Sequence, residues 1–245
     1  MEARSPTRAH VCPIFLNVAT RIVVLVILLI IVLATVGIFI HHERHAARQR
    51  ATIQSEIDRL KPAAIAMDHL LESAGVAERR AAQARAEANR AGQRRHELGT
   101  SSSPDVDTAR RLAATELSEV ELLQKLESDI DGYDTQVIEQ CKVAFSPDQS
   151  AALISLNSSR EAAIAHWLDN WFEAARDASD DLKAISNGED PPINGGDIEQ
   201  RYQDSLAAGM HADALSRQLD QGFDDLRDEL KDIIDALERQ RTALR

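Results

Sequence analysis

Aromatic residues and glycine are scarce in this chain of 245 residues. Phe, Trp and Tyr together make up 4% of the sequence, and there are only 10 glycines. The strand-favouring residues Val and Ile are concentrated in one apolar run near the N-terminus, whereas the remainder is rich in Ala, Leu, Glu, Asp, Arg and Gln. No alternating strand pattern of about five to eight residues occurs outside that run. The composition therefore argues against a β-rich fold and predicts an all-α protein.

Motifs for catalysis, phosphate binding and metal binding are also missing. The sequence contains no G-x-S-x-G, no G-x-x-x-x-G-K and no G-x-G-x-x-G. It has no Glu-x-x-His pair of the kind that holds di-iron centres in helical bundles. The two cysteines, Cys12 and Cys141, lie on either side of the apolar run, and there is no C-x-x-C. We therefore expect no enzymatic activity, no cofactor and no metal site.

A long apolar run is the clearest positive feature of the chain. Residues 22–40 read IVVLVILLIIVLATVGIFI and include no charged side chain. As a helix the run is about 28 Å long, close to the hydrocarbon thickness of a bilayer. A cleaved signal peptide is the alternative, but its apolar region would be only about 7–15 residues and a small-residue cleavage site would follow. The run predicts one transmembrane helix after a short tail over residues 1–21, with the lipid bilayer as its partner.

Histidine and arginine follow the apolar run. We expect five of these side chains to lie at the lipid headgroups: His41, His42, Arg44, Arg48 and Arg50. A metal held by His41 and His45, one helical turn apart, is the alternative, but nothing nearby supplies a convincing third ligand. Arginines flank the run on both sides in nearly equal number, so the short arginine-containing tail decides the orientation. We expect a single-pass protein with its bulk outside the cytoplasm.

Charge is distributed unevenly beyond the apolar run. Residues 41–98 carry 11 basic and 8 acidic side chains, whereas residues 99–245 carry 14 basic and 31 acidic ones. The arginines over residues 79–95 allow two interpretations, a nucleic-acid-binding stripe or a basic helix packed beside acidic helices of the same chain. We expect no nucleic-acid partner, because the net charge of -12 would repel phosphate.

Four helical segments are expected from apolar spacing and capping signals. Apolar residues recur alternately at three and four positions, which is the heptad spacing of coiled coils. The expected helices span residues 57–98, 104–145, 147–186 and 197–245, after a helical stalk over 41–56. Short connections favour a long, coiled-coil-like antiparallel four-helix bundle that continues from the transmembrane helix. An extended coiled-coil rod that forms a homo-oligomer is the alternative, since heptad seams fit both.

Several single residues set the expected helix boundaries. Ser103, followed by proline, and Ser146, with Gln149 at the capping-box position, are expected to cap the second and third helices. Asp197 is expected to cap the fourth, after a segment rich in Pro and Gly. Pro62 is expected on the outward face of the first helix, where it should bend or break that helix.

Aromatic residues of the third and fourth helices mark the one candidate site. Matched helix lengths place Trp167 and Trp171 opposite the small residues at 74–77 of the first helix, where large side chains would fill space. Together with Tyr202 they form a cluster that serves either core packing or ligand binding.

Two functions are compatible with these features. The first is a membrane-anchored scaffold or adaptor that presents a protein-binding surface near the membrane to an unidentified protein partner. The alternative is a small-ligand sensory bundle that acts with a membrane partner. The layout resembles in shape the extracytoplasmic sensor bundle of bacterial chemoreceptors, although this chain has neither a second membrane span nor a signalling output domain, and no residue roles are carried over. A polar cavity near the tryptophans would favour sensing, and a filled core would favour the scaffold.

Overall fold

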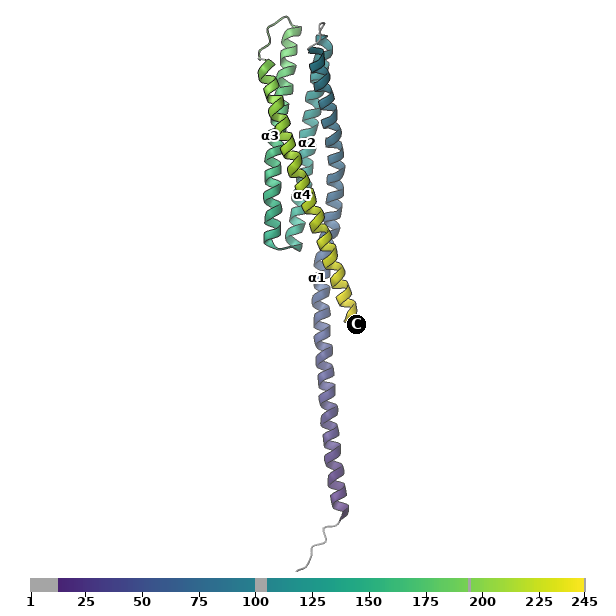
Figure 1. The fold of residues 1–245 in the computed structure, drawn as a ribbon. Coiled ribbons are helices and arrows are strands. Elements are labelled where there is room, and N and C mark those ends of the chain that lie inside the picture. The colour runs from purple at the N-terminus through teal and green to yellow at the C-terminus, as the bar shows by residue number, and fades with distance from the viewer. Residues whose placement is uncertain (1–12, 100–104, 194, 245) are drawn as a thin grey trace, which may run out of the picture. The chain divides into compact units, whose positions relative to one another are not determined.

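The computed structural model describes residues 13–99, 105–193 and 195–244, with side chains at 26, 28–98, 105–193 and 195–244. Four helices account for nearly all of these residues: α1 (Pro13–Gly99), α2 (Val106–Ala144), α3 (Pro147–Ser186) and α4 (Gly195–Ala243) (Figure 1). Within the described ranges there is no strand, so the all-α prediction is confirmed there. Two compact units are distinguished, one formed by residues 1–55 with 239–245 and the other by Glu56–Glu238.

The apolar run belongs to the first unit and is helical throughout. All of its described side chains are exposed, with Ile38 at 71% and Phe39 at 63%. The Thr35 hydroxyl can donate to the backbone carbonyl oxygen of Ile31 or Val32, each 2.9 Å away. Its polar group is therefore satisfied inside the helix, as an apolar solvent requires. By length and composition, this part of α1 is able to cross a membrane.

Pro62 does not interrupt α1. The helix continues through this position, so the predicted break is absent. The proline ring is exposed, as expected for the outward face. An exposed proline costs the helix one backbone hydrogen bond, but water can reach the carbonyl group that loses its donor. The continuous burial of Leu60, Ala63 and Met67 on the opposite face stabilises the helix across the proline.

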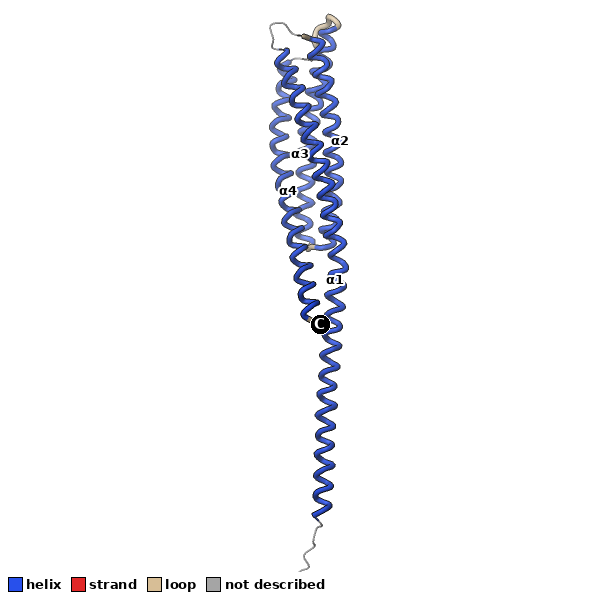
Figure 2. The backbone as a smooth tube through the Cα atoms, turned by 90° about the vertical axis from the view of Figure 1, so that its right-hand side faces the viewer, coloured by secondary structure: helices blue, strands red, loops and turns tan. Residues whose placement is uncertain are grey.

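Within Glu56–Glu238, contacts between neighbouring helices run antiparallel (Figure 2). In the ion pairs Lys61–Glu238, Asp68–Lys231 and Arg85–Asp213, the residue number increases along α1 while it decreases along α4. The same order relates α2 to α3, which pack closely together, through Glu116–Trp171 and Glu127–Arg160. Short connections between consecutive helices require this arrangement.

The predicted cap of α3 is confirmed. The Gln149 backbone N–H donates to Ser146 Oγ at 3.4 Å, and the Ser146 N–H donates to Gln149 Oε1 at 3.2 Å, which completes a capping box. The predicted cap Ser103 lies outside the described residues, and Asp105 caps α2 by accepting from the Thr108 N–H at 3.0 Å. Asp197 is not a cap, because α4 begins at Gly195 and places this carboxylate in the first turn. There it still interacts favourably with the helix dipole.

Two hydrophobic clusters fill the second unit. One packs alanines of α1, including Ala81, Ala84 and Ala88, with Trp167 and Trp171. The other is mainly aliphatic and contains, among others, Leu60, Met67, Val137, Leu219, Phe223 and Leu230. Leu206 and Ile185, which match the expected apolar stripes, are 58% and 43% exposed. The heptad spacing identified the side of each helix that faces the core, but it did not show where along the helix the core ends.

Truncation of Phe223 tests the aliphatic cluster. This side chain is 1% exposed, so Phe223→Ala should lower the free energy of unfolding by about 3–5 kcal/mol through lost burial and a residual cavity. Leu206→Ala, at an exposed position of the same helix, should change it by less than about 0.5 kcal/mol. Urea unfolding followed by circular dichroism measures both variants. Equal losses would show that Phe223 is not a core residue.

Candidate functional site

Two of the three aromatic residues of the expected cluster, Trp171 and Tyr202, bind one buried carboxylate, and Trp167 packs beside Trp171. Trp167 and Trp171 lie one turn apart on α3, with ring centroids 5.9 Å apart. Trp171 Nε1 donates to Glu116 Oε1 at 3.1 Å, and the Tyr202 hydroxyl donates to the same oxygen at 2.8 Å. The structure therefore brings α2, α3 and α4 together around Glu116, a residue that the sequence analysis did not identify.

A cation from α1 neutralises this carboxylate. Glu116 is 1% exposed, and its second oxygen accepts from Arg95 Nε at 3.1 Å. Arg95 Nη2 also donates to the Tyr202 hydroxyl oxygen at 2.7 Å. Burial, followed by the neighbouring Glu116 charge, raises the pKa of Tyr202, which keeps its hydroxyl protonated as a donor. Each oxygen of the buried carboxylate thus has a donor, which compensates much of the cost of removing its charge from water.

Two glycines allow the close approach of these helices. A Cβ atom at Gly92 of α1 would lie 2.7 Å from Glu116 Oε1, and one at Gly209 of α4 would lie 3.0 Å from Trp167 Nε1. The tryptophans were predicted to lie opposite residues 74–77. Ala77 of this range belongs to the same hydrophobic cluster, whereas the guanidinium that packs on Trp167 is that of Arg85, eight residues or about 12 Å further along α1. The pairing of Glu116 with Gly92 and Arg95 sets a stagger between α1 and α2 that chain lengths alone did not indicate.

Arg85 packs on the face of Trp167. Its Cζ lies 4.4 Å from the ring centroid, within the range of a cation–π contact. Arg85 Nη1 also donates to Asp213 Oδ1 of α4 at 2.7 Å. This pair is only partly buried, so solvent screens its Coulomb attraction. The guanidinium thus joins α1, α3 and α4 beside the Glu116 cluster.

A cleft of about 990 Å³ adjoins the cluster and is lined by all four helices. We call it the tryptophan cleft. Its polar lining includes Arg85, Asn89, Arg95 and Glu116, and its aromatic and apolar lining includes Trp167, Trp171, Ile185, Ile198, Tyr202 and Leu206. The volume is at the upper end of the range for small-molecule sites, about 300–1,000 Å³. The mixture of apolar walls and a few fixed polar groups is typical of sites that orient an organic ligand.

A second buried cation joins the middle of α2, α3 and α4. Arg160 is 4% exposed; its Nη1 is 3.1 Å from Asp134 Oδ2, and its Nε donates to Ser216 Oγ at 3.1 Å. Burial raises the pKa of Asp134 to about 7, with smaller contributions from the Asp220 and Glu78 charges and an opposing one from Arg160. This cluster joins helices of the bundle and contains no aromatic side chain, so we interpret it as structural.

The residues expected at the lipid interface lie on α1 in the first unit. The side chains of His41, His42, Arg44 and Arg48 are exposed and that of Arg50 is partly buried. Within the described residues, no group of three or more His, Cys, Asp or Glu side chains is arranged to hold a metal. These positions do not contribute to the tryptophan cleft.

The sequence did contain a signal for Glu116. It lies three residues after Ala113 and four before Val120, both fully buried, so it occupies the apolar stripe of α2. A charged residue at such a position requires a buried counter-ion. Comparisons with protein-family models, with curated proteins and with solved structures find no match to this chain. The chemistry of the cleft is therefore the basis for assigning a function.

Removal of Glu116 tests the buried cluster. Glu116→Ala leaves Arg95 without its buried counter-ion, and we expect a loss of about 3–5 kcal/mol in unfolding free energy. Glu121→Ala, an exposed glutamate of the same helix, should change it by less than about 0.5 kcal/mol. Urea denaturation measures both. A loss below about 1 kcal/mol for Glu116→Ala would contradict the account of a neutralised buried charge.

The pH dependence of stability tests Asp134. Its folded pKa lies above its ordinary value, so its stabilising contribution is complete below pH about 4 and is lost as the pH rises to about 7. Asp134→Asn should remove this part of the slope, roughly 2–4 kcal/mol between the two pH values. Urea titrations at a series of pH values measure it, with the exposed Asp129→Asn as control. Parallel curves for the parent and Asp134→Asn would show that Asp134 titrates outside this window.

Proposed function

We propose that this protein is a membrane-anchored sensory bundle that binds a small ligand in the tryptophan cleft and acts with a membrane partner. The main support for this proposal is the tryptophan cleft. It combines a polar lining with two tryptophans and a tyrosine, and residues of all four helices line it. A core filled only by apolar side chains would instead have favoured a purely structural role.

The exposed apolar part of α1 supports the anchor. Side chains such as Ile38 and Phe39 find no protein partner within the described part of their unit, and burial of this surface in lipid would be strongly favourable. The helix also satisfies its own backbone hydrogen bonds, as a spanning segment requires. The short arginine-containing tail before it supports a position of the cleft outside the cytoplasm.

Ligand binding can change the bundle because the cleft is shared. α1 and α4 meet there through Arg85–Asp213 and Arg95–Tyr202, and α1 is the helix that also contains the apolar run. A ligand that contacts these side chains differently in two arrangements of the helices would shift their populations. Its differential affinity for the two arrangements limits the size of the shift.

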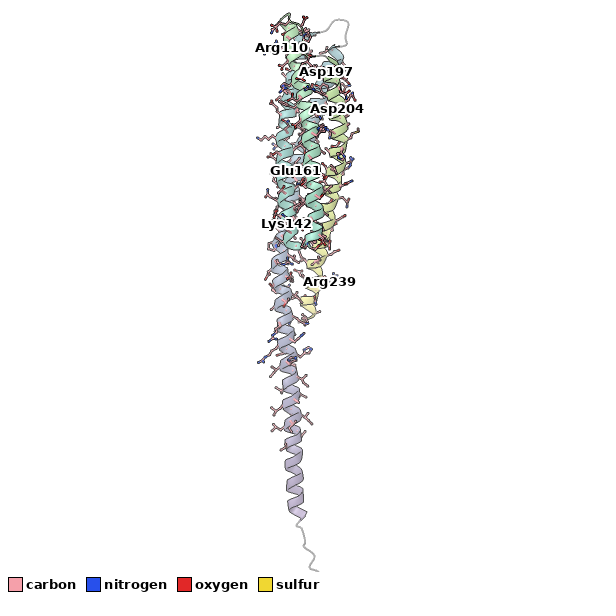
Figure 3. The ribbon with its side chains drawn as sticks, turned by 90° about the vertical axis from the view of Figure 1, so that its left-hand side faces the viewer. Arg110, Lys142, Glu161, Asp197, Asp204 and Arg239 are labelled. Carbon is pink, nitrogen blue, oxygen red and sulfur yellow. The ribbon has the colours of Figure 1, made fainter. Side chains whose placement is uncertain are left out.

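A scaffold or adaptor is the second candidate function. Acidic side chains are exposed on the outer faces of the bundle, among them Glu161, Asp197 and Asp204, which are labelled in Figure 3. The excess of acidic residues over residues 99–245 would favour a basic protein partner. In this case the partner would bind equally well with and without a small molecule.

A thermal screen of the full chain in detergent tests the sensory function. We expect at least one compound in a panel of small organic acids, amines and neutral metabolites to raise the unfolding midpoint. A ligand at about 100 times its Kd would add about 2.7 kcal/mol. Asn89→Phe, at an exposed position lining the cleft, should abolish the effect by blocking it.

Ala82→Phe is the matched control, because this exposed residue lies one heptad before Asn89 on α1 and does not line the cleft. The same stabilisation in Asn89→Phe and Ala82→Phe would place the ligand elsewhere. A panel that gives no stabilisation, together with ligand-independent capture of a basic partner, would favour the scaffold instead.

A further inference from the structure

The lining groups of the tryptophan cleft that the protein leaves available determine which kind of ligand the cleft can bind. We infer that the cleft takes a small organic carboxylate with an apolar body. This inference rests on the ligand-binding function proposed above and adds the class of ligand. It follows from three features of the lining: a cation on two of the three aromatic rings, a carboxylate already bound by the protein, and guanidinium donors that make no hydrogen bond within the described residues.

Two of the three aromatic rings that line the cleft already carry a cation of the protein. The guanidinium of Arg85 lies 4.4 Å from the centroid of Trp167, and that of Arg95 lies 5.4 Å from the centroid of Tyr202. A ligand ammonium group placed on either face would have to displace a guanidinium or lie beside it. Repulsion between like charges therefore disfavours a cationic ligand.

Glu116 offers little to a cationic ligand either. Its Oε1 atom accepts from Trp171 and Tyr202, and its Oε2 atom accepts from Arg95. The side chain is 1% exposed, so a ligand would have to break a buried hydrogen bond in order to reach it. The negative charge of Glu116 is thus paired within the protein, whereas the guanidinium groups of Arg85 and Arg95 line the cleft.

The two arginines have donors left for an anion. Arg95 uses one Nε and one Nη2 hydrogen in its described bonds, and Arg85 uses Nη1 for Asp213. A guanidinium carries five N–H donors in a planar fork that matches a carboxylate. Arg85 is partly exposed, so an incoming carboxylate can compete with Asp213 for it without opening the core.

Two acidic lining residues, Asp181 and Glu199, lie away from Arg85 along the cleft. Asp181 Oδ1 accepts the backbone N–H of Ile193 at 3.2 Å, and Glu199 is exposed. Glu199 lies fourteen positions, or about 20 Å of helix, before the Asp213 that pairs with Arg85 on α4. A carboxylate held at Arg85 would therefore be well separated from Glu199.

The apolar part of the ligand has its own surface. Leu206 and Ile185 line the cleft and are 58% and 43% exposed, although both match the apolar stripes of their helices. An apolar body that covers Leu206 would remove this surface from water. Leu206 lies seven positions, or about 10 Å of helix, before the Asp213 that pairs with Arg85, so a small ligand with its carboxylate at Arg85 can place a hydrocarbon or aromatic body toward Leu206.

Tryptophan fluorescence provides a direct test, because both tryptophans of the chain line the cleft. The full chain in phosphatidylcholine vesicles is titrated with phenylacetate, 2-phenylethylamine and 2-phenylethanol, which share one aromatic body and differ in charge. We expect saturable binding of phenylacetate, and binding of the amine and the alcohol at least about tenfold weaker. Arg85→Gln should weaken the binding of phenylacetate by about tenfold and leave the binding of the alcohol unchanged.

Arg80→Gln is the matched control, because it removes the same charge from an exposed position of α1 outside the cleft. Circular dichroism establishes that both variants remain folded. Phenylacetate binding that is no tighter than that of the amine or alcohol, or that is equal in Arg85→Gln and Arg80→Gln, would overturn the carboxylate assignment. Preferential binding of the amine or alcohol would leave the ligand-binding function intact. A failed thermal screen would count against that function itself.

Discussion

The burial of one carboxylate determines how the four helices pack at the cleft end of the bundle. Glu116 of α2 is almost fully buried, and its charge is balanced by donors from α1, α3 and α4. An isolated charge in such a position would cost several kcal/mol, so the three donors must all be in place when the bundle forms. Since each donor comes from a different helix, satisfying Glu116 fixes the registers of all three helices relative to α2. Gly92 favours the same contact, because a Cβ atom there would lie 2.7 Å from Glu116 Oε1 and the carboxylate would have to shift.

The two ends of the bundle are built differently, and the difference matters for function. Around Leu219, Phe223 and Leu230 the core is apolar and mainly aliphatic, and its burial stabilises the bundle. Around Trp167 and Trp171 the core combines alanine, aromatic rings and paired charges, and a cleft remains beside it. Fixed polar groups at the wall of an open cleft can orient a ligand, which a filled aliphatic core cannot do. The structural and ligand-binding roles that we propose are therefore separated along the same four helices.

The sequence predicted the helices themselves better than the contacts between them. Heptad spacing and the Ser146–Gln149 capping box identified four helices, because both are local patterns that a helix satisfies by itself. Pro62 was expected to interrupt α1, but packing on the opposite face outweighs the loss of one hydrogen bond. The expected aromatic cluster does come together, yet its contacts with Arg85 and Glu116 were not anticipated. Those contacts depend on the stagger between helices, and a periodic stripe is compatible with several staggers. The apolar stripe also predicted that Leu206 would be buried, whereas it is exposed at the cleft. Periodicity alone does not show where a cleft, and not a neighbouring helix, faces the stripe.

A double-mutant cycle on the two donors to Glu116 Oε1 tests the central claim most directly. Trp171→Phe and Tyr202→Phe each remove one donor to that oxygen while keeping an aromatic ring in place. The free energies of unfolding of the full chain, of both single variants and of the double variant are measured by urea denaturation. If one buried carboxylate joins α3 and α4, the two losses should be non-additive by about 0.5–3 kcal/mol. Losses that add within about 0.3 kcal/mol would show that the two side chains act independently, and would contradict a register set by Glu116.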